Sequence, residues 1–550
     1  MIQKYGIDFG TTNSSIAVRY ADLEEHEHTI VADLKDRYPK ETIPSVVCIC
    51  EDGNIFVGMD AYEQLGKLKA AGKNARLIKR VKMDLESRGA DVKYKVGNRT
   101  FEGSDLIAAI LKYLRIRADQ ELNAYGVKAS GVVLGVPVQY GDVQKDVLKS
   151  ALVKAGFYDN KADADKNTEF VSEPVAVAVH YGLNVTDNKT VMVFDFGGGT
   201  LDLAIVNLKE QVGFDHLHPH EVKSKNRLTI GGEELSRLFF IHTFCGTDGY
   251  GTKEICKAFN FDKQLTPNEL WERLSAHNIG VEFLDEVEQC KCELSTSKYY
   301  AFSFMGPGGI ELKERKIFRS SFEDAIREIL DQVKDLIDDC LEKAEIEDAY
   351  YIDHVIIAGG SSLIPSVQEL LMSIFGKKKV STRPGSSTGK HGNFSLHTTS
   401  EREVLTSIVR GLAAVGCRKE TLVEDVVDND YGLWVDAKER FEPIIKNGTP
   451  VKEASVFNKV YGEGLHIDIK TQYEDQSNVT IKVFQQSLNG LEQLGSIFIE
   501  EAGSQKYRLY MHIDPKQGIL IVDICDRMKK TWFEIPLNQK QYNIKQQKEG

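Results

Sequence analysis

The chain has 550 residues, more than one hydrophobic core usually supports, which predicts two to four domains. Hydrophobic residues make up 42% and charged residues 27% of the chain, the usual balance of a globular protein, and no apolar stretch reaches the length of a membrane span. Acidic residues outnumber basic ones by 82 to 69, so the formal charge of −13 argues against a broad electrostatic nucleic-acid interface.

The first predicted element is a strand, a turn and a second strand over residues 4–18 (KYGIDFGTTNSSIAV), and residues 191–206 (VMVFDFGGGTLDLAIV) repeat this pattern. Each copy has an apolar strand, the triplet Asp-Phe-Gly, a turn of small residues and another apolar strand. The aspartates of the two copies, Asp8 and Asp195, lie about one domain length apart. The repeat predicts a duplicated α/β fold with one lobe for each copy.

Further elements between and after the two copies agree with an α/β plan. The periodicity predicts helices over 104–124, 142–156, 321–344 and 401–416, a strand over 131–137, and strand–turn–helix units over 169–182 and 353–376. Between them, residues 377–400 form a polar loop rich in Gly, Ser and Thr.

The sequence changes character after about residue 420. A short acidic stretch, TLVEDVVDND, is followed by alternating apolar and polar positions, which predict an all-β domain of seven or eight strands. We therefore expect lobe I at 1–184, lobe II at 185–420, a linker at 421–430, a β-sandwich domain at 431–537 and an unstructured polar tail at 538–550.

The two glycine-rich turns are candidate phosphate loops, because backbone N–H groups without side chains around them can approach phosphate oxygens. Thr11 and Thr12 add hydroxyl donors to the first turn, and Gly197, Gly198, Gly199 and Thr200 form the second. Asp8 and Asp195 precede the turns and could hold Mg²⁺ through its water ligands. Each turn alone could be only a tight hairpin. Neither is a Walker A loop or a protein-kinase Asp-Phe-Gly site.

The order of motifs along residues 3–416 resembles the ATPase domain of the seventy-kilodalton heat-shock chaperones of the DnaK type. The motifs are GIDFGTTNSSIAV, LIKRV, GVPVQYGDVQKDVL, SEPVAVAVHYGL, FDFGGGTLDLAIV, IGGEELSR, EQCKCELS and VIIAGGSSLIPSVQELL. The resemblance implies an α/β actin-like ATPase fold with two duplicated lobes and with ATP and Mg²⁺ in the cleft. A slow hydrolysis of ATP to ADP and phosphate is the implied activity.

The resemblance also implies roles for individual residues. Lys79 would stabilise charge on the γ-phosphate, and Glu173, Thr200 and Asp202 would position the attacking water or the metal shell. Asp8 and Asp195 would be the metal residues, and Pro137 and Lys145 would form an interlobe switch. The implied ATP-binding residues are Gly10, Thr11, Thr12, Asn13, Gly197, Gly198, Gly199, Thr200, Gly231, Gly232, Glu288, Lys291, Ser295, Gly359, Gly360 and Ser361.

Each of these residues also has an ordinary structural interpretation. Lys79 lies in a basic stretch and could be a solvated charge, and Glu173 precedes a proline and could be a turn residue. The residues Glu288, Lys291 and Ser295 could share an exposed helix face. The chain departs from the family at Leu363 and Lys145, where the family has arginines, and in the loop 377–400. Adenine selectivity and interlobe coupling are therefore open.

The C-terminal region resembles the chaperone's peptide-binding β sandwich more faintly. Phe457, Val479 and Ile481 fall where the family lines its peptide pocket, although all three could be ordinary core residues of a sandwich. The linker has lost the family's leucines, which predicts weaker docking onto the ATPase domain. Only a short polar segment follows residue 537, so we expect no helical lid.

Three functions stay open on the sequence alone. The first is an ATP-dependent chaperone that binds unfolded or extended peptide, with possible co-chaperones and exchange factors as partners. The second is a nucleotide-dependent scaffold for one dedicated protein, and the third is a small-molecule kinase of the same superfold. The nine cysteines form no CxxC pair, and the N-terminus has no apolar signal segment, so we expect a cytoplasmic protein with reduced thiols.

Overall fold

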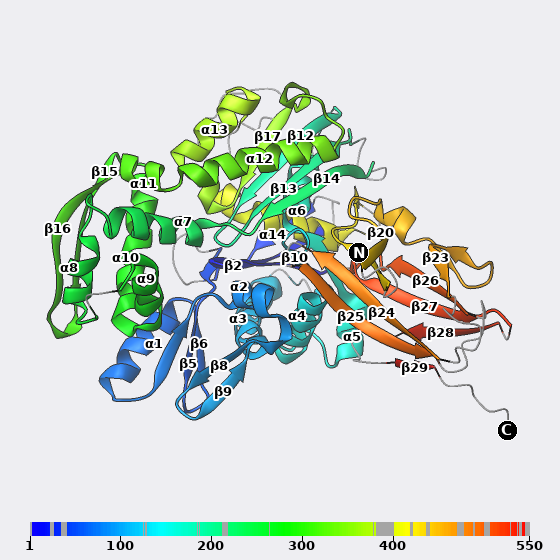
Figure 1. The fold of residues 1–550 in the computed structure, drawn as a ribbon, viewed down its shortest axis with the longest axis horizontal. Helices are drawn as coiled ribbons and strands as arrows, with labels where there is room; N and C mark the ends of the chain where they lie inside the picture. The colour runs from blue at the N-terminus through cyan, green and yellow to red at the C-terminus, as the bar shows by residue number, and fades with distance from the viewer. Residues whose placement is uncertain are drawn as a thin grey trace.

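The computed structural model describes three parts in chain order: two α/β lobes and a β domain (Figure 1). The loop predicted at 377–400 lies mostly outside the described residues. These are 3–21, 27–34, 41–124, 126, 129–183, 185, 187–211, 218–262, 265–377, 379–380, 401–418, 422–435, 440–469, 478–487, 490–499, 507–528, 530–535, 537 and 542–544.

Lobe I is built on a six-stranded mixed sheet. The strands run in the order β11 (Thr168–Ser172), β10 (Val132–Val136), β1 (Tyr5–Phe9), β2 (Asn13–Ala21) and β3 (Glu27–Val31), with β4 (Ile43–Pro44) paired to β2. Strand β1 is parallel to β10 and antiparallel to β2, as the predicted hairpin requires. Its helices are α1 (Met59–Ala70), α2 (Val81–Arg88), α3 (Gly103–Ala124), α4 (Asp142–Lys154), α5 (Lys161–Asn167) and α6 (Glu173–Gly182).

Lobe II repeats this arrangement around the second hairpin. The order is β17 (His354–Ala358), β12 (Lys189–Phe196), β13 (Leu201–Leu208), β14 (His220–Leu228) and β18 (Val423–Glu424). Strand β12 is parallel to β17 and antiparallel to β13, so the two copies of the hairpin occupy equivalent places in two sheets. The helices of this lobe are α7 (Gly232–Phe239), α8 (Gly251–Ala258), α9 (Pro267–Ala276), α10 (Asn278–Leu294), α11 (Arg319–Ala325), α12 (Arg327–Lys343) and α13 (Pro365–Phe375).

Smaller sheets extend both lobes. Lobe I carries β5 (Val47–Cys50), β6 (Ile55–Val57) and β7 (Ala75–Ile78), together with the hairpin β8 (Lys93–Val96) and β9 (Arg99–Glu102); lobe II carries the hairpin β15 (Tyr299–Gly306) and β16 (Ile310–Phe318). Separate apolar cores fill the two lobes, and a third apolar cluster around α6 joins residues of both.

Helix α14 (Glu401–Cys417) departs from the predicted domain boundaries, because it packs on lobe I although it follows lobe II in sequence. A Cβ added at Gly6 of β1 would lie 2.4 Å from the Ala413 nitrogen, and one at Gly411 would lie 1.8 Å from the Ala176 oxygen. The helix backbone therefore approaches β1 and α6 more closely than any side chain at these glycines would allow.

The C-terminal region is the predicted all-β domain, with two sheets around one core. The sheets are β20 (Arg440–Ile445), β19 (Asp430–Val435), β24 (Val479–Ser487), β25 (Gly490–Ile499) and β29 (Tyr542–Ile544), and β23 (His466–Asp468), β26 (Tyr507–Ile513), β27 (Leu520–Asp526) and β28 (Thr531–Ile535). A short helix α15 (Val451–Ala454) and a hairpin of β21 (Phe457–Asn458) and β22 (Glu463–Gly464) complete the domain. Strand β29 corrects the expectation of an unstructured tail, because Ile544 is buried in this core.

The linker contacts lobe II, and the strength of this docking stays a prediction. Strand β18 pairs in parallel with β14, and the buried Lys225 of β14 lies 2.9 Å from Asp425 and 2.5 Å from Asp428. Val426 enters the cluster around α6, and Val427 enters the core of the β domain. Valines and a buried ion pair thus take the place that leucines were expected to fill.

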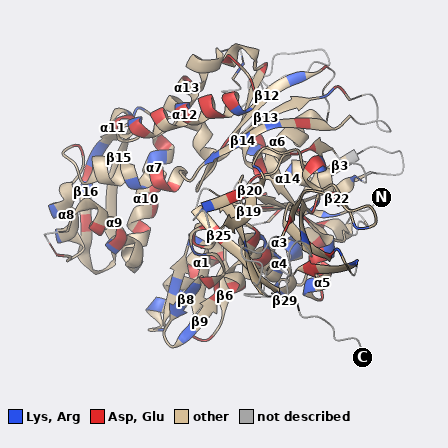
Figure 2. Cartoon of the chain, turned by 45° about the vertical axis from the view of Figure 1, so that its right-hand side comes forward, with Lys and Arg blue, Asp and Glu red and all other residues tan. Residues whose placement is uncertain are grey.

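The β domain also contacts lobe I directly, through the turn between β26 and β27 (Figure 1). Lys145 Nζ donates to the Gly518 oxygen at 2.8 Å, and the Leu520 N–H donates to Asp142 Oδ2 at 3.0 Å. The expected switch residue Lys145 is therefore buried at the junction of two domains. Charges of both signs are spread over all three parts (Figure 2). Within the described ranges, no helix is long and apolar enough to cross a membrane.

Candidate nucleotide site

The two glycine-rich turns face each other at the boundary between the lobes. A Cβ added at Gly198 would lie 1.9 Å from Thr12 Oγ1, and one added at Gly199 would lie 2.5 Å from Thr11 Oγ1. Because these distances are far below van der Waals contact, only glycine allows the turns to meet. The hairpins that the sequence placed in separate lobes therefore form one site.

Backbone hydrogen bonds hold the second turn in shape. The Gly197 N–H donates to the Thr200 oxygen at 2.9 Å, and the N–H groups at the start of α7 donate to Gly197 and Gly198 at 3.0 and 2.9 Å. Ser361 Oγ donates to the Gly197 oxygen at 2.9 Å. The start of α7, near Gly231 and Gly232, is thereby fixed against this turn.

Gly359 has a left-handed backbone with φ of 74°, where a Cβ would lie 2.7 Å from Asp195 Oδ1. This glycine lets the strand end of β17 pass beside the carboxylate of Asp195. The turn Gly360–Leu363 follows directly, so Ser361 reaches the second loop from this side.

Four buried carboxylates lie beneath the turns: Asp8, Glu173, Asp195 and Asp202. Asp195 and Asp202 are direct partners across β12 and β13. Burial and then the charge of Glu173 raise the pKa of Asp8 to about 7, and the same two causes raise the pKa of Asp195. Burial also raises the pKa of Asp202 to about 7, although Arg227 opposes this shift. The cluster carries more negative charge than its protein surroundings neutralise.

This excess of carboxylates fits the Mg²⁺ that the resemblance implies. A divalent cation would relieve the repulsion that raises the pKa values of Asp8 and Asp195. In the part of the chain that the structure describes, no three acidic, His or Cys side chains converge closely enough to coordinate a metal directly.

A lysine lies at the carboxylates, but it is Lys82 rather than the expected Lys79. Lys82 of α2 is buried, with its Nζ 2.6 Å from Glu173 Oε1. Burial alone would lower its pKa, but Glu173, Asp8 and Glu86 raise the pKa overall. Lys79 instead pairs with Asp285 of α10, across the lobe boundary.

The displacement of Lys79 has a simple structural cause. Strand β7 ends at Ile78 and α2 begins at Val81, so Lys79 and Arg80 lie in the connection and point to lobe II, where Arg80 Nε is 2.8 Å from Glu233 Oε1. Lys82 lies inside the first turn of α2 and faces the interior. The LIKRV motif favoured Lys79, whereas the structure places Lys82 at the buried carboxylates, and the catalytic role of either lysine stays a prediction.

Asp202 is held by donors from two directions. Thr200 Oγ1 donates to Asp202 Oδ2 at 2.6 Å, and the Val138 N–H donates to Oδ1 at 2.9 Å. Val138 directly follows Pro137 at the end of β10, so the residue expected to be a switch proline lies next to a catalytic candidate. The structure brings Thr200 and Asp202 into contact, and Glu173 is close enough to raise the pKa of Asp202, while the catalytic roles of all three stay predictions.

Three of the residues that were expected to surround the adenine base lie on α10 or directly at its end. Lys291 is buried, and its Nζ donates to the Gly232 oxygen at 2.7 Å and to Ser236 Oγ at 2.9 Å. Glu288 lies 2.8 Å from the same ammonium. Lys291 therefore serves to fasten α10 to α7. Ser295 ends α10, and its carbonyl oxygen accepts a hydrogen bond from Arg319.

The structure does not assemble the expected peptide pocket from Phe457, Val479 and Ile481. Ile481 is buried in the sandwich core and Val479 packs against that core. Phe457 makes its ring contacts elsewhere, stacking on His512 with centroids 4.2 Å apart and approaching Trp532 at 5.5 Å. The ordinary core interpretation therefore describes Ile481. Exposed apolar side chains occur nearby at Val460 and Tyr461 of the β21–β22 hairpin.

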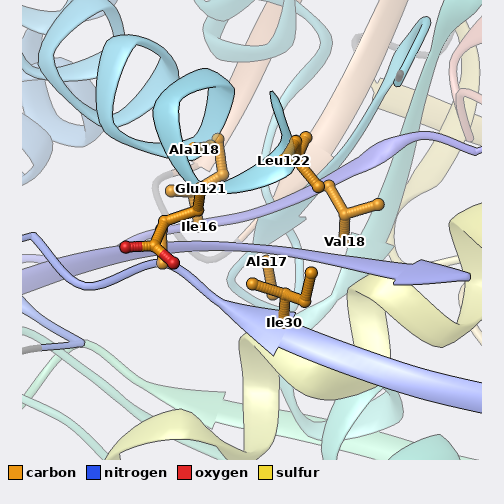
Figure 3. A pocket seen from close by; sticks show the side chains of 8 residues that line it. Ile16, Ala17, Val18, Ile30, Ala118, Glu121 and Leu122 are labelled. Atoms are coloured by element: carbon orange, nitrogen blue, oxygen red, sulfur yellow. The ribbon is translucent and has the colours of Figure 1, made fainter. Parts of the chain in front are cut away.

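A small hollow in lobe I has no part in this site. It lies between β2, β3 and the end of α3, lined by Ile16, Ala17, Val18, Ile30, Ala32, Ala118, Glu121 and Leu122 (Figure 3). None of the glycine loops or the buried aspartates lines it, and its walls are mainly aliphatic.

Three residues that the motifs did not identify belong to the site: Lys82, Glu86 and Arg227. Arg227 of β14 lies 2.5 Å from Glu86 Oε2 and 3.7 Å from Asp202 Oδ1. All three lie outside the helices and strands that the sequence predicted, so no pattern in the sequence identified them. The sequence could not show which of these charges are buried.

The class of this protein is defined by two features. Its two lobes meet at opposed glycine loops over buried carboxylates, and a β domain follows them. The family model described as Hsp70 protein matches residues 4–385, and the chain belongs to this family. It is 27% identical to the chaperone protein DnaK of Thermosipho melanesiensis, over 87% of this chain and 70% of that protein. The DnaK of Thermotoga petrophila is 27% identical over 84% and 69%, and that of Emiliania huxleyi 27% identical over 68% and 56%.

Proposed function

We propose that the chain binds ATP with Mg²⁺ between its two glycine loops and hydrolyses it slowly, as a chaperone-like ATPase of actin-like fold in the cytoplasm. One observation carries this proposal: the loops of both lobes meet over four buried carboxylates and one buried lysine. Membership of the Hsp70 family supports the same function.

Each group then has a chemical role. N–H groups of the loops and the hydroxyls of Thr11 and Thr12 bind the phosphates. Bound Mg²⁺ neutralises charge that develops on the phosphoryl oxygens. Lys82 stabilises the same charge from lobe I, while Asp202, held by Val138 and Thr200, orients the attacking water.

The first test compares the two candidate lysines. Lys82→Met should lower kcat for ATP hydrolysis about 100-fold or more, because the ammonium at the transferred group is lost. Lys79→Met should change kcat less than about fivefold, since its ammonium pairs with Asp285 of α10 rather than with the buried carboxylates. Turnover is measured at saturating ATP, and nucleotide affinity separately. A larger loss in Lys79→Met than in Lys82→Met would contradict the assignment.

We further propose that the β domain binds extended apolar peptide and that nucleotide state affects this binding. The exposed Val460 and Tyr461, and the direct contacts between the β domain and lobe I, support this part. ATP turnover should rise when extended apolar peptides are added at micromolar concentrations. Phosphorylation of an added small molecule instead would identify a kinase.

A second candidate, a nucleotide-dependent scaffold for one dedicated protein, is favoured by the burial of Ile481 in the core. Under this alternative the β domain takes no general peptide, and turnover stays constant across a peptide library while a single cellular protein co-purifies with the ATP-bound form. Binding of many unrelated peptides would exclude the scaffold.

A further inference from the structure

Arg227 is a buried arginine with contacts to both lobes. It lies on β14 of lobe II, and only 4% of the residue is exposed. Its Nη2 is 2.5 Å from Glu86 Oε2 on α2, and its Nη1 donates to the Val138 oxygen at 3.2 Å. Its Nε lies 3.7 Å from Asp202 Oδ1. Two of these three partners belong to lobe I and the third is the water-orienting candidate.

The contacts form a closed ring through the backbone N–H and C=O of one residue of lobe I, Val138. Val138 donates its N–H to Asp202 and accepts, at its own carbonyl, a hydrogen bond from Arg227. Arg227 in turn lies beside Asp202. The direction of the Asp202 carboxylate therefore depends on Val138, and the position of Val138 depends on Arg227.

The same arginine also fixes helix α2. Lys82 and Glu86 are one helical turn apart, so they project from the same face of this helix, and both are buried. Lys82 reaches Glu173 while Glu86 reaches Arg227. The buried Val81 and Leu85 and the hydrogen bond from Tyr94 to Asp84 hold this helix within lobe I, and the ion pair with Arg227 adds a constraint from lobe II. The contact between Glu86 and Arg227 therefore helps to set where the Lys82 ammonium lies.

We propose that Arg227 is a positioning residue that couples closure of the lobes to hydrolysis. Its planar fork needs Glu86 and Val138 of lobe I to be close to β14 of lobe II, and only then are Asp202 and Lys82 both in place. The proposal rests on the proposed ATPase function. Burying an arginine is costly, so a pair of this kind is poorly explained by stability alone.

The test replaces the whole ion pair by apolar side chains. Arg227→Met alone would leave the buried Glu86 without its arginine partner, which destabilises the fold. Arg227→Met together with Glu86→Met removes both charges and should keep the protein folded. For the double variant we expect kcat about 100-fold below that of the unchanged protein, with the nucleotide Kd within about threefold. This split between kcat and affinity is not expected from a purely structural role.

A matched control comes from Arg315 and Glu254 in lobe II, which are 2.7 Å apart and lie away from the glycine loops. Arg315 also donates to a backbone carbonyl, that of Gly249, as Arg227 does. The double variant Arg315→Met with Glu254→Met should keep kcat within about threefold of the unchanged protein, since it removes the same chemical groups at a remote place.

Hydrogen exchange provides a readout that does not depend on hydrolysis. When a non-hydrolysable ATP analogue binds, the amides of α2 and of residues 138–140 should become protected in the unchanged protein but not in the Arg227→Met, Glu86→Met variant. Unchanged kcat or full protection in this variant would overturn the coupling role. An unchanged protein that binds the analogue without turning over ATP would refute the proposed function, while the protection pattern still decides the role of Arg227.

Discussion

At the scale of single residues, the contact between Gly198 and Thr12 makes a sharp prediction. An added Cβ would lie 1.9 Å from Thr12 Oγ1, so Gly198→Ala must push the two loops apart. A shift of about 1 Å at the phosphate loops should reduce ATP turnover about 100-fold and weaken nucleotide binding. Isothermal titration with ATP and turnover assays measure both quantities.

Gly66 offers the control for this substitution. It lies in the middle of α1, and no heavy atom lies within 4 Å of an added Cβ. Gly66→Ala should leave ATP turnover unchanged and stabilise the chain by about 0.5–1 kcal/mol, because alanine favours the helix. If Gly198→Ala also bound and hydrolysed ATP normally, the opposed loops could not be the phosphate site.

The same scale shows what the sequence could and could not predict. Aspartates before glycine turns identified both loops, because backbone geometry demands small residues there. The contact of Lys82 with Glu173 was not predicted, since it depends on the point where β7 ends and α2 begins. Arg227 was missed because it occupies a strand position whose burial follows only from the approach of lobe I.

At the scale of elements, strand β14 contains the buried His220 and also pairs with the linker strand β18. The His220 N–H donates to the Leu422 oxygen at 2.9 Å, and the Lys209 N–H donates to His220 Nδ1 at 3.1 Å. Nδ1 is therefore an acceptor, and a proton there would face an amide donor. Burial lowers the pKa of His220 to about 4, below the value of about 6.5 for an unfolded chain.

This shift predicts acid sensitivity of the strand and linker. The unfolded chain binds a proton at His220 between about pH 6.5 and pH 4 while the folded chain does not, so the stability contribution is present above pH 6.5 and falls as the pH drops. We expect a loss of about 2 kcal/mol between pH 7 and pH 5 from this residue. Urea titrations at both pH values measure the loss.

The variant His220→Asn keeps an acceptor for the Lys209 N–H but does not titrate in this range. It should therefore show a loss smaller by about 2 kcal/mol between pH 7 and pH 5 than the unchanged protein. His180 of α6 also has a pKa lowered to about 4 by burial, so some acid sensitivity remains in the variant. Equal losses in the two proteins would show that His220 titrates normally in the folded chain.

The elements also show which contacts of the linker its composition did not predict. Its composition suggested weak docking, because the leucines that would bury apolar surface are absent. Docking instead uses backbone pairing with β14 and the pair of acids around Lys225, which is 3% exposed. The acidic linker and the lysine two hundred residues before it meet only after both parts of the chain have folded.

At the scale of the whole molecule, the junction between the β domain and lobe I consists largely of polar contacts. Asp142 accepts hydrogen bonds from the Leu520 N–H and from the Tyr431 hydroxyl, and Lys149 Nζ reaches Gln517 at 2.5 Å. Interfaces of this kind between domains separate more readily than large apolar ones. The two domains should therefore be able to part without unfolding.

Reversal of one charge at the junction tests this expectation. Lys149→Glu would break the contact with Gln517, which is the contact of this side chain with the β domain, and would also place a carboxylate against Asp165 of lobe I, now 3.1 Å from the Lys149 ammonium. A compact chain of this length has a radius of gyration of about 24 Å, and the variant should exceed this value in small-angle scattering. The control Lys154→Glu changes the same helix, but its partners Glu102 and Asp105 lie within lobe I, so the radius should not change. A radius that stays constant in Lys149→Glu would mean that the linker and its pairing with β14 hold the domains together without help from this junction.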